Sequence, residues 1–298
     1  MKYAKLVHNP TAGEGEHTAE ELLALIEKAG YTCSYSSTKE EGWDKMKEDM
    51  DLVIVAGGDG TVRKIADRLL HRKRIDKPFP IALLPYGTAN NIATTLGLDK
   101  KPDEIISNWD LKNRKPFDIG KIYGLKKASF FLESFGFGVF PELIDTMRKH
   151  DDVIDSPEEK IEKALKELTK IVETYPGRHT RLIMDGEELE GNYLLCEIMN
   201  TRSVGPNLVL SPAADPGDGE FEVVLVSDEQ RDLLAAYVEN RIKGNERDVS
   251  FTVRKARNIT IFRDGSLFHS DDELIETKRP KEIRIELFSA ALEFLKTD

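Results

Sequence analysis

Short apolar runs alternate with amphipathic helical patterns in the first third of the chain. Four runs rich in β-branched and aromatic residues predict strands: Tyr3 to Val7, Tyr31 to Ser36, Leu52 to Ala56 and Ile81 to Leu84. Between them, apolar residues recur at helical spacing in three sets: Ala19, Leu22, Leu23 and Ile26, then Trp43, Met46 and Met50, then Val62, Ile65, Ala66, Leu69 and Leu70. This alternation predicts an α/β domain with a doubly wound parallel sheet and helices on both faces.

The pattern changes near Pro116, where short strands separated by turn residues become frequent. The predicted strands are Asp118–Tyr123, Ala128–Glu133, Arg178–Met184, Tyr193–Met199, Phe221–Val226, Phe251–Val253 and Ile259–Phe262. One helix interrupts them, beginning at Pro157 and ending before Pro176. The sequence therefore predicts a second, mainly antiparallel β domain.

Composition narrows the class of protein. The 298 residues include 43 Lys and Arg against 54 Asp and Glu, a net charge of −11, which argues against a nucleic-acid binder. Cys33 and Cys196 lie in apolar strand-like runs, so buried reduced thiols are expected. The N-terminus lacks a signal-peptide pattern, and the uncharged run 78–98 is broken by prolines and glycines. We therefore expect a cytoplasmic protein without a membrane span.

Three loops carry the clearest candidate chemistry. Leu52 to Ala56 leads directly into Gly57-Gly58-Asp59-Gly60-Thr61 and a helix, which places backbone N–H groups at a positive helix terminus suited to phosphate. Asn9 to Gly13 follows the first strand and Leu84 to Asn91 begins at the end of the fourth. Because the carboxyl ends of parallel strands meet at one sheet edge, these loops are expected to converge there.

Together these loops resemble the catalytic domain of the diacylglycerol kinase, sphingosine kinase and NAD kinase superfamily. The segment Leu84 to Asn91, read as LPxGTxN, is similar to the soluble bacterial lipid kinases, and the likeness continues through 200–202 and 212–221 to the end of the chain. The resemblance implies an NAD kinase-like nucleotide domain over 1–118 with a C-terminal return at 286–298. It also implies a β-sandwich domain over 119–285 that supplies the lipid-acceptor side.

The resemblance also assigns site residues. Asp271 and Glu273 align with the family's Asp-Gly-Glu, one as general base and the other as its neighbour, although as a bare acidic cluster they also fit a solvated turn. A Mg²⁺ outside the nucleotide site is implied, held by the Asp218 carboxylate and the backbone carbonyls of Asp215 and Glu220, where a surface hairpin would equally explain the sequence. The implied ATP-binding residues are Asn9, Pro10, Thr11, Ala12, Gly13, Thr38, Gly57, Gly58, Asp59, Gly60, Thr61, Val62, Arg63 and Thr88.

The resemblance implies an ATP- and Mg²⁺-dependent lipid kinase that converts diacylglycerol to phosphatidic acid. A kinase of another lipid alcohol, such as a sphingoid base, and an inactive nucleotide-binding regulator remain alternatives. The partner would be a lipid at a membrane surface, reached by transient association, and a homodimer is compatible with the family. The chain departs from the family pattern at Arg63, Lys64, Asn91 and Asp272.

Two segments have alternative interpretations concerning the membrane. Alternation around Gly136 and Gly138 would leave some of the nearby phenylalanine rings at a cleft edge, whereas the simpler interpretation is core packing. A basic run would contact anionic headgroups or form a solvated helix end. The phenylalanines are Phe130, Phe131, Phe135, Phe137 and Phe140, and the basic residues are Arg68, Arg72, Lys73, Arg74 and Lys77.

Overall fold

The computed structural model describes residues 2–13, 17–72, 78–149, 156–245, 249–278 and 282–297. The chain divides into two compact units: unit 1 is Met1–Phe117 with Ala290–Asp298, and unit 2 is Asp118–Ser289. Two strands run from one unit into the other, β5 (Arg114–Tyr123) and β17 (Ile283–Leu295). The basic residues Lys73, Arg74 and Lys77 lie outside the described part of the chain.

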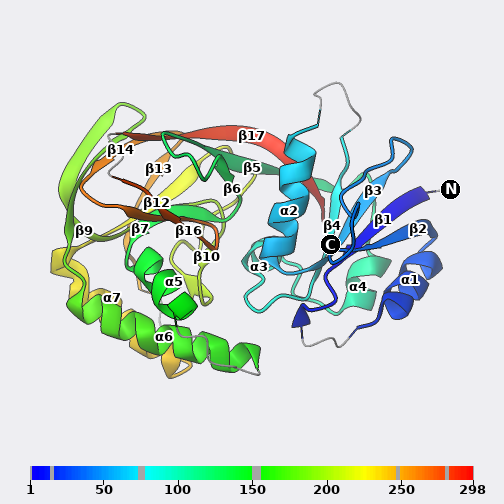
Figure 1. Cartoon of the computed structure of the whole chain (residues 1–298), viewed down its shortest axis with the longest axis horizontal. Coiled ribbons are helices and arrows are strands. Elements are labelled where there is room, and N and C mark those ends of the chain that lie inside the picture. The colour runs from blue at the N-terminus through cyan, green and yellow to red at the C-terminus, as the bar shows by residue number, and fades with distance from the viewer. Residues whose placement is uncertain are drawn as a thin grey trace. The chain divides into compact units, whose positions relative to one another are not determined.

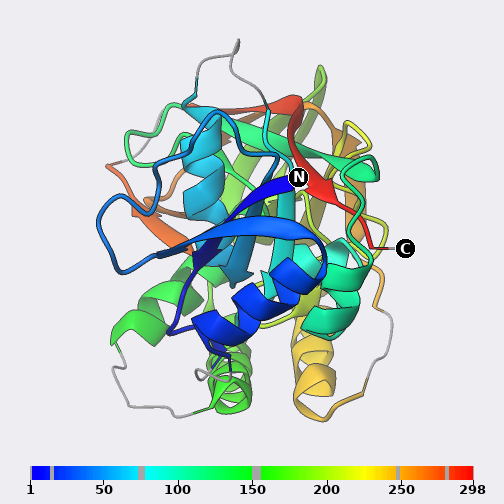
Figure 2. The same ribbon diagram turned by 90° about the vertical axis from the view of Figure 1, so that its right-hand side faces the viewer.

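Unit 1 is built on a parallel sheet in the order β2-β1-β3-β4, with the end of β17 pairing beside β4. Its helices α1 and α4 cover one face of this sheet and α2 covers the other (Figures 1 and 2). The elements are β1 (Lys2–His8), α1 (Ala19–Lys28), β2 (Tyr31–Ser37), β3 (Leu52–Gly57), α2 (Asp59–Leu70), β4 (Ile81–Pro85), α3 (Asn91–Thr95) and α4 (Pro102–Ser107).

The strand order explains why ligands would be bound at one place on unit 1. From β1 the chain passes outward to β2, and from β3 it passes the opposite way to β4. The crossover direction therefore reverses between β1 and β3, and binding sites of doubly wound sheets lie beyond the carboxyl ends of the strands at such a switch point. The loops after β1 and β3 flank this point.

One helix prediction in unit 1 is wrong. The segment from Trp43 to Met50 consists of turns and irregular backbone, with a hydrogen bond from Lys45 N–H to the Gly42 carbonyl at 3.1 Å. Gly42, just before this segment, has a φ of 77° and belongs to the preceding turn. Of the three apolar residues that suggested the helix, Met50 is buried, whereas Trp43 and Met46 are half-buried. The three side chains therefore do not share a buried helix face.

Unit 2 is dominated by antiparallel strands, as predicted, with β9 pairing to β7, β8 and β12. Helices α5, α6 and α7 lie together on one side of it (Figure 1). The elements that complete unit 2 are β6 (Phe130–Phe131), β7 (Ser134–Gly138), α5 (Val139–Lys149), α6 (Pro157–Thr174), β8 (Arg178–Met184), β9 (Glu187–Met199), β10 (Ser203–Val204), β11 (Leu208–Val209), β12 (Phe221–Ser227), a 3₁₀ turn (Asp228–Gln230), α7 (Arg231–Ile242), β13 (Thr252–Ala256), β14 (Asn258–Arg263), β15 (Leu267–Ser270) and β16 (Glu273–Glu276).

Burial decides one alternative left by the sequence, that of the phenylalanine segment, and confirms the expected burial of Cys196 but not of Cys33. All five phenylalanines of the segment 130–140 are buried, so the expectation of rings at a cleft edge is wrong and core packing is correct. Cys196 is buried and Cys33 half-buried, neither in a disulfide, and burial raises the pKa of the Cys33 thiol to about 11. No helix among the described residues is long and apolar enough to cross a membrane.

Candidate active site

The glycine-rich loop between β3 and α2 packs directly against the loop after β4. A Cβ atom added to Gly58 would lie 2.7 Å from the Gly87 Cα, and one added to Gly87 would collide with the Gly58 Cα in turn. Helix α2 begins at Asp59 with Gly58 as its N-cap residue, and no side chain caps it there. The first N–H groups of α2 therefore point toward whatever lies beyond the sheet edge, which is favourable for an anion.

Asp59 links the two loops. Its carboxylate accepts hydrogen bonds from the backbone N–H groups of Asn91, at 2.9 Å, and Ile92, at 3.1 Å, at the start of α3. Asn90 has a left-handed φ of 52°, and its side-chain amide bonds both the N–H and the carbonyl of Gly87 at 2.7 Å. The segment read as LPxGTxN is therefore a closed turn that Asp59 attaches to the start of α2.

The loop after β1 is organised by the Asn9 side chain. Asn9 Oδ1 accepts from Thr11 Oγ1 at 3.0 Å and from Thr38 Oγ1, after β2, at 3.5 Å. The Asn9 N–H donates to the Ala56 carbonyl of β3 at 2.9 Å. Gly13 has a φ of 57°, and a Cβ there would lie 3.0 Å from the Tyr86 carbonyl oxygen. The loops after β1, β2, β3 and β4 are therefore in mutual contact at one sheet edge.

The ATP-binding residues implied by the resemblance fall into two groups. Thr61 and Val62 are buried on the inner side of α2, so their side chains face the protein interior. Gly60 and Thr88 are exposed, and Arg63 is half-buried on α2. Pro10 and Ala12 belong to the β1 loop with Asn9, Thr11 and Gly13. The fourteen predicted positions therefore lie in and beside the loops at one edge of unit 1, although the side chains of Thr61 and Val62 do not face that edge.

An aromatic stack behind these loops was not predicted from the sequence. His17 and Tyr86 stack with ring centroids 3.3 Å apart and planes 9° from parallel. His8, the last residue of β1, lies 5.2 Å from the His17 ring. Burial lowers the pKa of both histidines, which favours neutral rings. The only sign of this contact in the sequence was Tyr86, a single aromatic residue in the loop after β4.

The acidic turn predicted to be catalytic lies in unit 2, between β15 and β16. Asp271 is buried with a φ of 53°. Its Oδ1 accepts from the backbone N–H groups of Leu132 at 3.0 Å, Glu133 at 2.7 Å and Ser134 at 3.3 Å. Its own N–H donates to the Ser134 carbonyl at 2.8 Å. The Asp271 carboxylate is therefore fixed against the chain before β7.

Glu273 has different surroundings, because it is exposed at the first position of β16. The departure from Asp-Gly-Glu at Asp272 also has a structural explanation. In this turn the left-handed residue is Asp271 rather than Asp272, so the backbone does not require a glycine at 272. Arg148 Nη2 donates to the Asp272 carbonyl at 3.3 Å and ties the turn to α5.

A buried ion pair lies beneath this turn and was also missed. His269 Nε2 is 2.9 Å from both carboxylate oxygens of Glu197, and His269 Nδ1 is 2.9 Å from the Asp271 carbonyl oxygen. Burial acts to lower the pKa of His269, but the Glu197 charge and hydrogen bonds outweigh it, so the pKa is raised overall. No sequence signal joins residues so far apart in the chain.

The loop implied to hold Mg²⁺ is already in contact with a positively charged side chain, that of Lys255 on β13. Asp218 Oδ2 and Glu220 Oε2 accept from the Lys255 ammonium at 3.1 and 3.0 Å, and Asp218 Oδ1 accepts from the Glu220 N–H at 3.0 Å. Asp215 Oδ1 accepts from the Gly217 N–H at 2.9 Å. The one side chain that the resemblance assigns to the metal, the Asp218 carboxylate, is therefore paired with an ammonium group. Among the described residues, no group of three or more His, Cys, Asp or Glu side chains is arranged to hold a metal ion.

Comparison with known proteins gives matches over both units. Residues 3–122 match the family model of the diacylglycerol kinase catalytic domain, and residues 148–295 match that of the YegS C-terminal NAD kinase beta sandwich-like domain. The chain is 28% identical over 247 residues to a diacylglycerol kinase of Bacillus subtilis, covering 76% of this chain and 74% of that protein. It is 27% identical over 237 residues to a diacylglycerol kinase of Staphylococcus carnosus, covering 76% and 72%.

Solved structures confirm the predicted fold class. A diacylglycerol kinase from Bacillus anthracis str. Sterne matches with a TM-score of 0.72 and 22% identity, covering 99% of this chain and 96% of that one. An NAD kinase from Archaeoglobus fulgidus, solved in complex with ATP, matches with a TM-score of 0.55 and 14% identity, covering 100% and 94%. At these identities the two structures establish the fold and nothing finer.

Proposed function

Because the chain belongs to the diacylglycerol kinase catalytic-domain family, we propose that it transfers the γ-phosphate of ATP to a lipid hydroxyl and that diacylglycerol is the acceptor. The observation that carries this proposal is the close approach of the Gly58 and Gly87 backbones, which leaves no room for a side chain on either residue. It brings the glycine-rich loop and the loop after β4 together beside the start of α2, and a helix N-terminus suits the phosphates of a nucleotide.

The acidic turn at Asp271 to Glu273, between β15 and β16, supports the proposal of phosphoryl transfer to an alcohol. The attacking hydroxyl must lose its proton to a positioned base. Glu273 is the better candidate for this base, since its side chain is exposed at the start of β16, whereas the Asp271 carboxylate receives three backbone N–H groups. In this proposal Asp271 holds the turn and Glu273 accepts the proton.

Mg²⁺ would reach the reaction with ATP as the metal–nucleotide substrate, where it neutralises phosphate charge. We assign no metal to the loop at Asp215, Asp218 and Glu220, because Lys255 already pairs with the Asp218 carboxylate that would hold it. For the lipid, we propose transient association with a membrane surface. Of the basic run, the structure describes Arg68 and Arg72, and both have other contacts, since Arg68 pairs with Asp44 at 3.0 Å and Arg72 lies over the Phe79 ring at 4.1 Å.

An acceptor panel tests the function. One preparation is incubated with labelled ATP and Mg²⁺ and offered diacylglycerol in vesicles, a sphingoid base in vesicles, or NAD. Label in phosphatidic acid supports the proposal. Efficient turnover of the sphingoid base alone would move the acceptor to another lipid alcohol, and turnover of NAD alone would exclude a lipid acceptor. ATP binding without transfer to any acceptor would indicate the regulator.

A further inference from the structure

Three residues on three neighbouring strands of unit 2 form a row across the sheet. His269 of β15 is paired with Gly136 of β7, and Gly136 is paired with Glu197 of β9. A Cβ added to Gly136 would collide with Glu197 Oε1. The glycine therefore leaves the space in which the two outer side chains meet above the central strand.

Hydrogen bonds hold the imidazole ring of this pair on both sides. His269 Nδ1 faces a backbone carbonyl oxygen and Nε2 faces the two oxygens of Glu197, each at 2.9 Å. Although burial lowers the pKa of His269, the Glu197 charge and these hydrogen bonds raise it overall, which favours an imidazolium that donates on both sides. His269 is 1% exposed and Glu197 is 0% exposed.

A pair buried this completely adds little net stability to a fold, because both groups lose their hydration. Apolar side chains of similar size often stabilise a fold as well or better. Its contacts indicate a more specific role. Within the described part of the chain, the side-chain hydrogen bonds of the pair run to each other and to the Asp271 carbonyl. The pair therefore restrains one residue outside itself, Asp271, which is the left-handed residue of the turn between β15 and β16.

We propose that His269 and Glu197 are positioning residues that hold Asp271 in its left-handed conformation and thereby present Glu273 for proton transfer. The inference rests on the proposed function for its catalytic consequence. Its structural part stands separately, because a left-handed aspartate carries a strain energy that neighbouring contacts must offset. The His269 bond fixes the Asp271 carbonyl, as Ser134 fixes its N–H.

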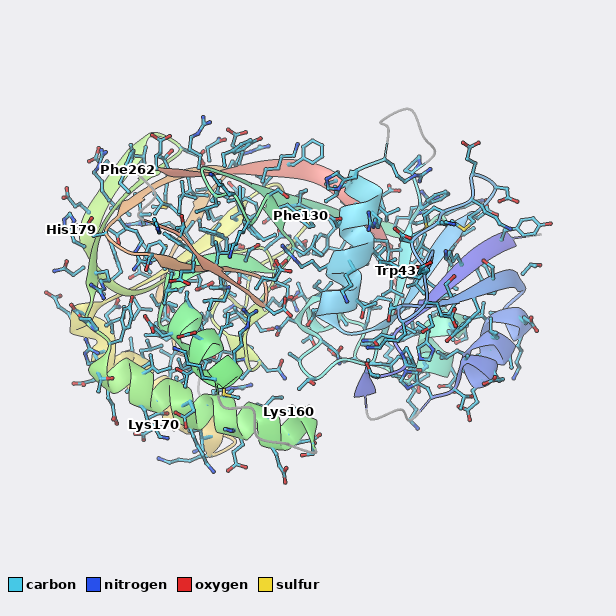
Figure 3. All side chains as sticks on the ribbon, in the orientation of Figure 1. Trp43, Phe130, Lys160, Lys170, His179 and Phe262 are labelled. Carbon is cyan, nitrogen blue, oxygen red and sulfur yellow. The ribbon has the colours of Figure 1, made fainter. Side chains whose placement is uncertain are left out.

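The test uses Glu197→Gln, which keeps an acceptor for Nε2 and removes the charge, and His269→Asn, which keeps only a short amide near the Asp271 carbonyl. The matched control is His179→Asn, which breaks the exposed His179–Glu190 pair at 2.9 Å on β8 and β9 of unit 2; Figure 3 labels His179. For each protein we would measure kcat with diacylglycerol, ATP affinity by calorimetry, the unfolding midpoint and amide hydrogen exchange at 132–134.

We expect Glu197→Gln and His269→Asn each to lower kcat by ~10-fold or more while ATP affinity changes by less than about twofold. Exchange at 132–134 should accelerate, because these amides donate to Asp271. The double variant should be no slower than the slower single variant, since the two residues act as one unit. His179→Asn should match the unmodified chain in every measurement.

Other outcomes overturn the inference. Unchanged kcat and unchanged exchange at 132–134 in Glu197→Gln would exclude a positioning role. Global unfolding, or equal losses of ATP affinity and kcat, would make the pair a general structural contact. If the unmodified chain phosphorylates no acceptor, the proposed function fails, and exchange at 132–134 still decides whether the pair holds Asp271.

Discussion

Asp271 and Glu273 are two residues apart, yet their surroundings suit different tasks. The Asp271 carboxylate has three backbone N–H groups as neighbours, whereas Glu273 is open to solvent at the beginning of β16. A carboxylate held by fixed donors is a good structural anchor. A base needs a lone pair that a substrate hydroxyl can reach. The two carboxylates are therefore expected to respond differently to substitution by the matching amide.

The first prediction separates the two roles. Glu273→Gln should lower kcat by ~10²-fold without changing the unfolding midpoint, because it removes the base from an exposed position. Asp271→Asn should lower both kcat and stability, the latter by ~1–3 kcal/mol, since an NH₂ group would face N–H donors. Parallel kinetics and denaturant unfolding measure both effects. Full activity in Glu273→Gln would assign the base to another residue.

Glu222 provides a test of pH dependence at a single residue. Burial, followed by repulsion from Asp218, raises its pKa to about 7, although Lys255 opposes the shift. A carboxyl whose pKa is raised by folding binds its proton more tightly in the folded state. Stability should therefore decrease as pH rises from the unfolded pKa, near 4.5, to about 7, and then level off.

Glu222→Gln should accordingly stabilise the protein at pH 8, by roughly 1–3 kcal/mol, and have little effect at pH 4.5 to 5. Thermal unfolding of the variant and the unmodified chain at several pH values gives the measurement. A gain in stability that is the same at pH 5 and pH 8 would show that Glu222 does not titrate in this range.

At the scale of elements, the first turns of α2 and α3 act together. Asp59 begins α2, and its carboxylate caps α3, so the loops after β3 and β4 are joined by one side chain. Thr18 provides a comparable cap at α1, accepting from the Glu21 N–H at 3.2 Å in a capping box. The two caps have similar chemistry, but only the first is in the candidate site.

The third prediction uses this contrast. Asp59→Ala and Thr18→Ala should each cost ~1 kcal/mol of stability, the usual value of an N-cap. Only Asp59→Ala should also weaken ATP binding, by ~10-fold or more, because the Gly87–Asn91 turn loses its attachment to α2. Calorimetric titration with ATP distinguishes the two variants. Equal ATP affinities would mean that the Asp59 cap has no part in the nucleotide site.

The elements also show which structure the sequence could predict. The alternation of strands and helices predicted the sheet of unit 1, because a buried parallel strand such as β3 is apolar throughout. The pattern at Trp43 to Met50 predicted a helix, but the segment forms turns and irregular backbone, and of its three apolar side chains only Met50 is buried. Helices α5 and α7 were not predicted, although Leu234, Tyr237 and Val238 of α7 have helical spacing and are buried.

The candidate site was predictable only in part, because the sequence indicates which loops meet but not which side chains tertiary packing brings together. Loops that follow parallel strands meet at one edge, so Gly58 and Gly87 could be placed near each other from the sequence. The left-handed Asp271, the Lys255 contacts with Asp218 and Glu220 and the His269–Glu197 pair depend on strand register and tertiary packing. No spacing rule relates side chains that are 35 to 72 residues apart in sequence.

At the scale of the whole molecule, the chain returns to unit 1 through the end of β17. Phe294 is fully buried, its residue is paired with Ile81 of β4, and its ring is 5.0 Å from that of Phe117. Arg114 also bonds Glu293 at 2.9 Å. The core of unit 1 is thus completed by residues that follow the whole of unit 2 in the sequence, so unit 1 cannot be complete until the last segment is in place.

Phe294→Ala should therefore destabilise unit 1 by ~3–5 kcal/mol through the cavity that it leaves. ATP binding should be lost at temperatures at which unit 2 remains folded, although Phe294 is not among the residues of the nucleotide loops. Amide exchange resolved by segment measures this directly, with Phe262→Ala on β14 as a control of the same residue type in unit 2 (Figure 3). If exchange accelerates equally in both units of Phe294→Ala, the units unfold together and β17 transmits the loss between them. If exchange in β1 and β3 is unchanged, the last segment does not support the nucleotide edge.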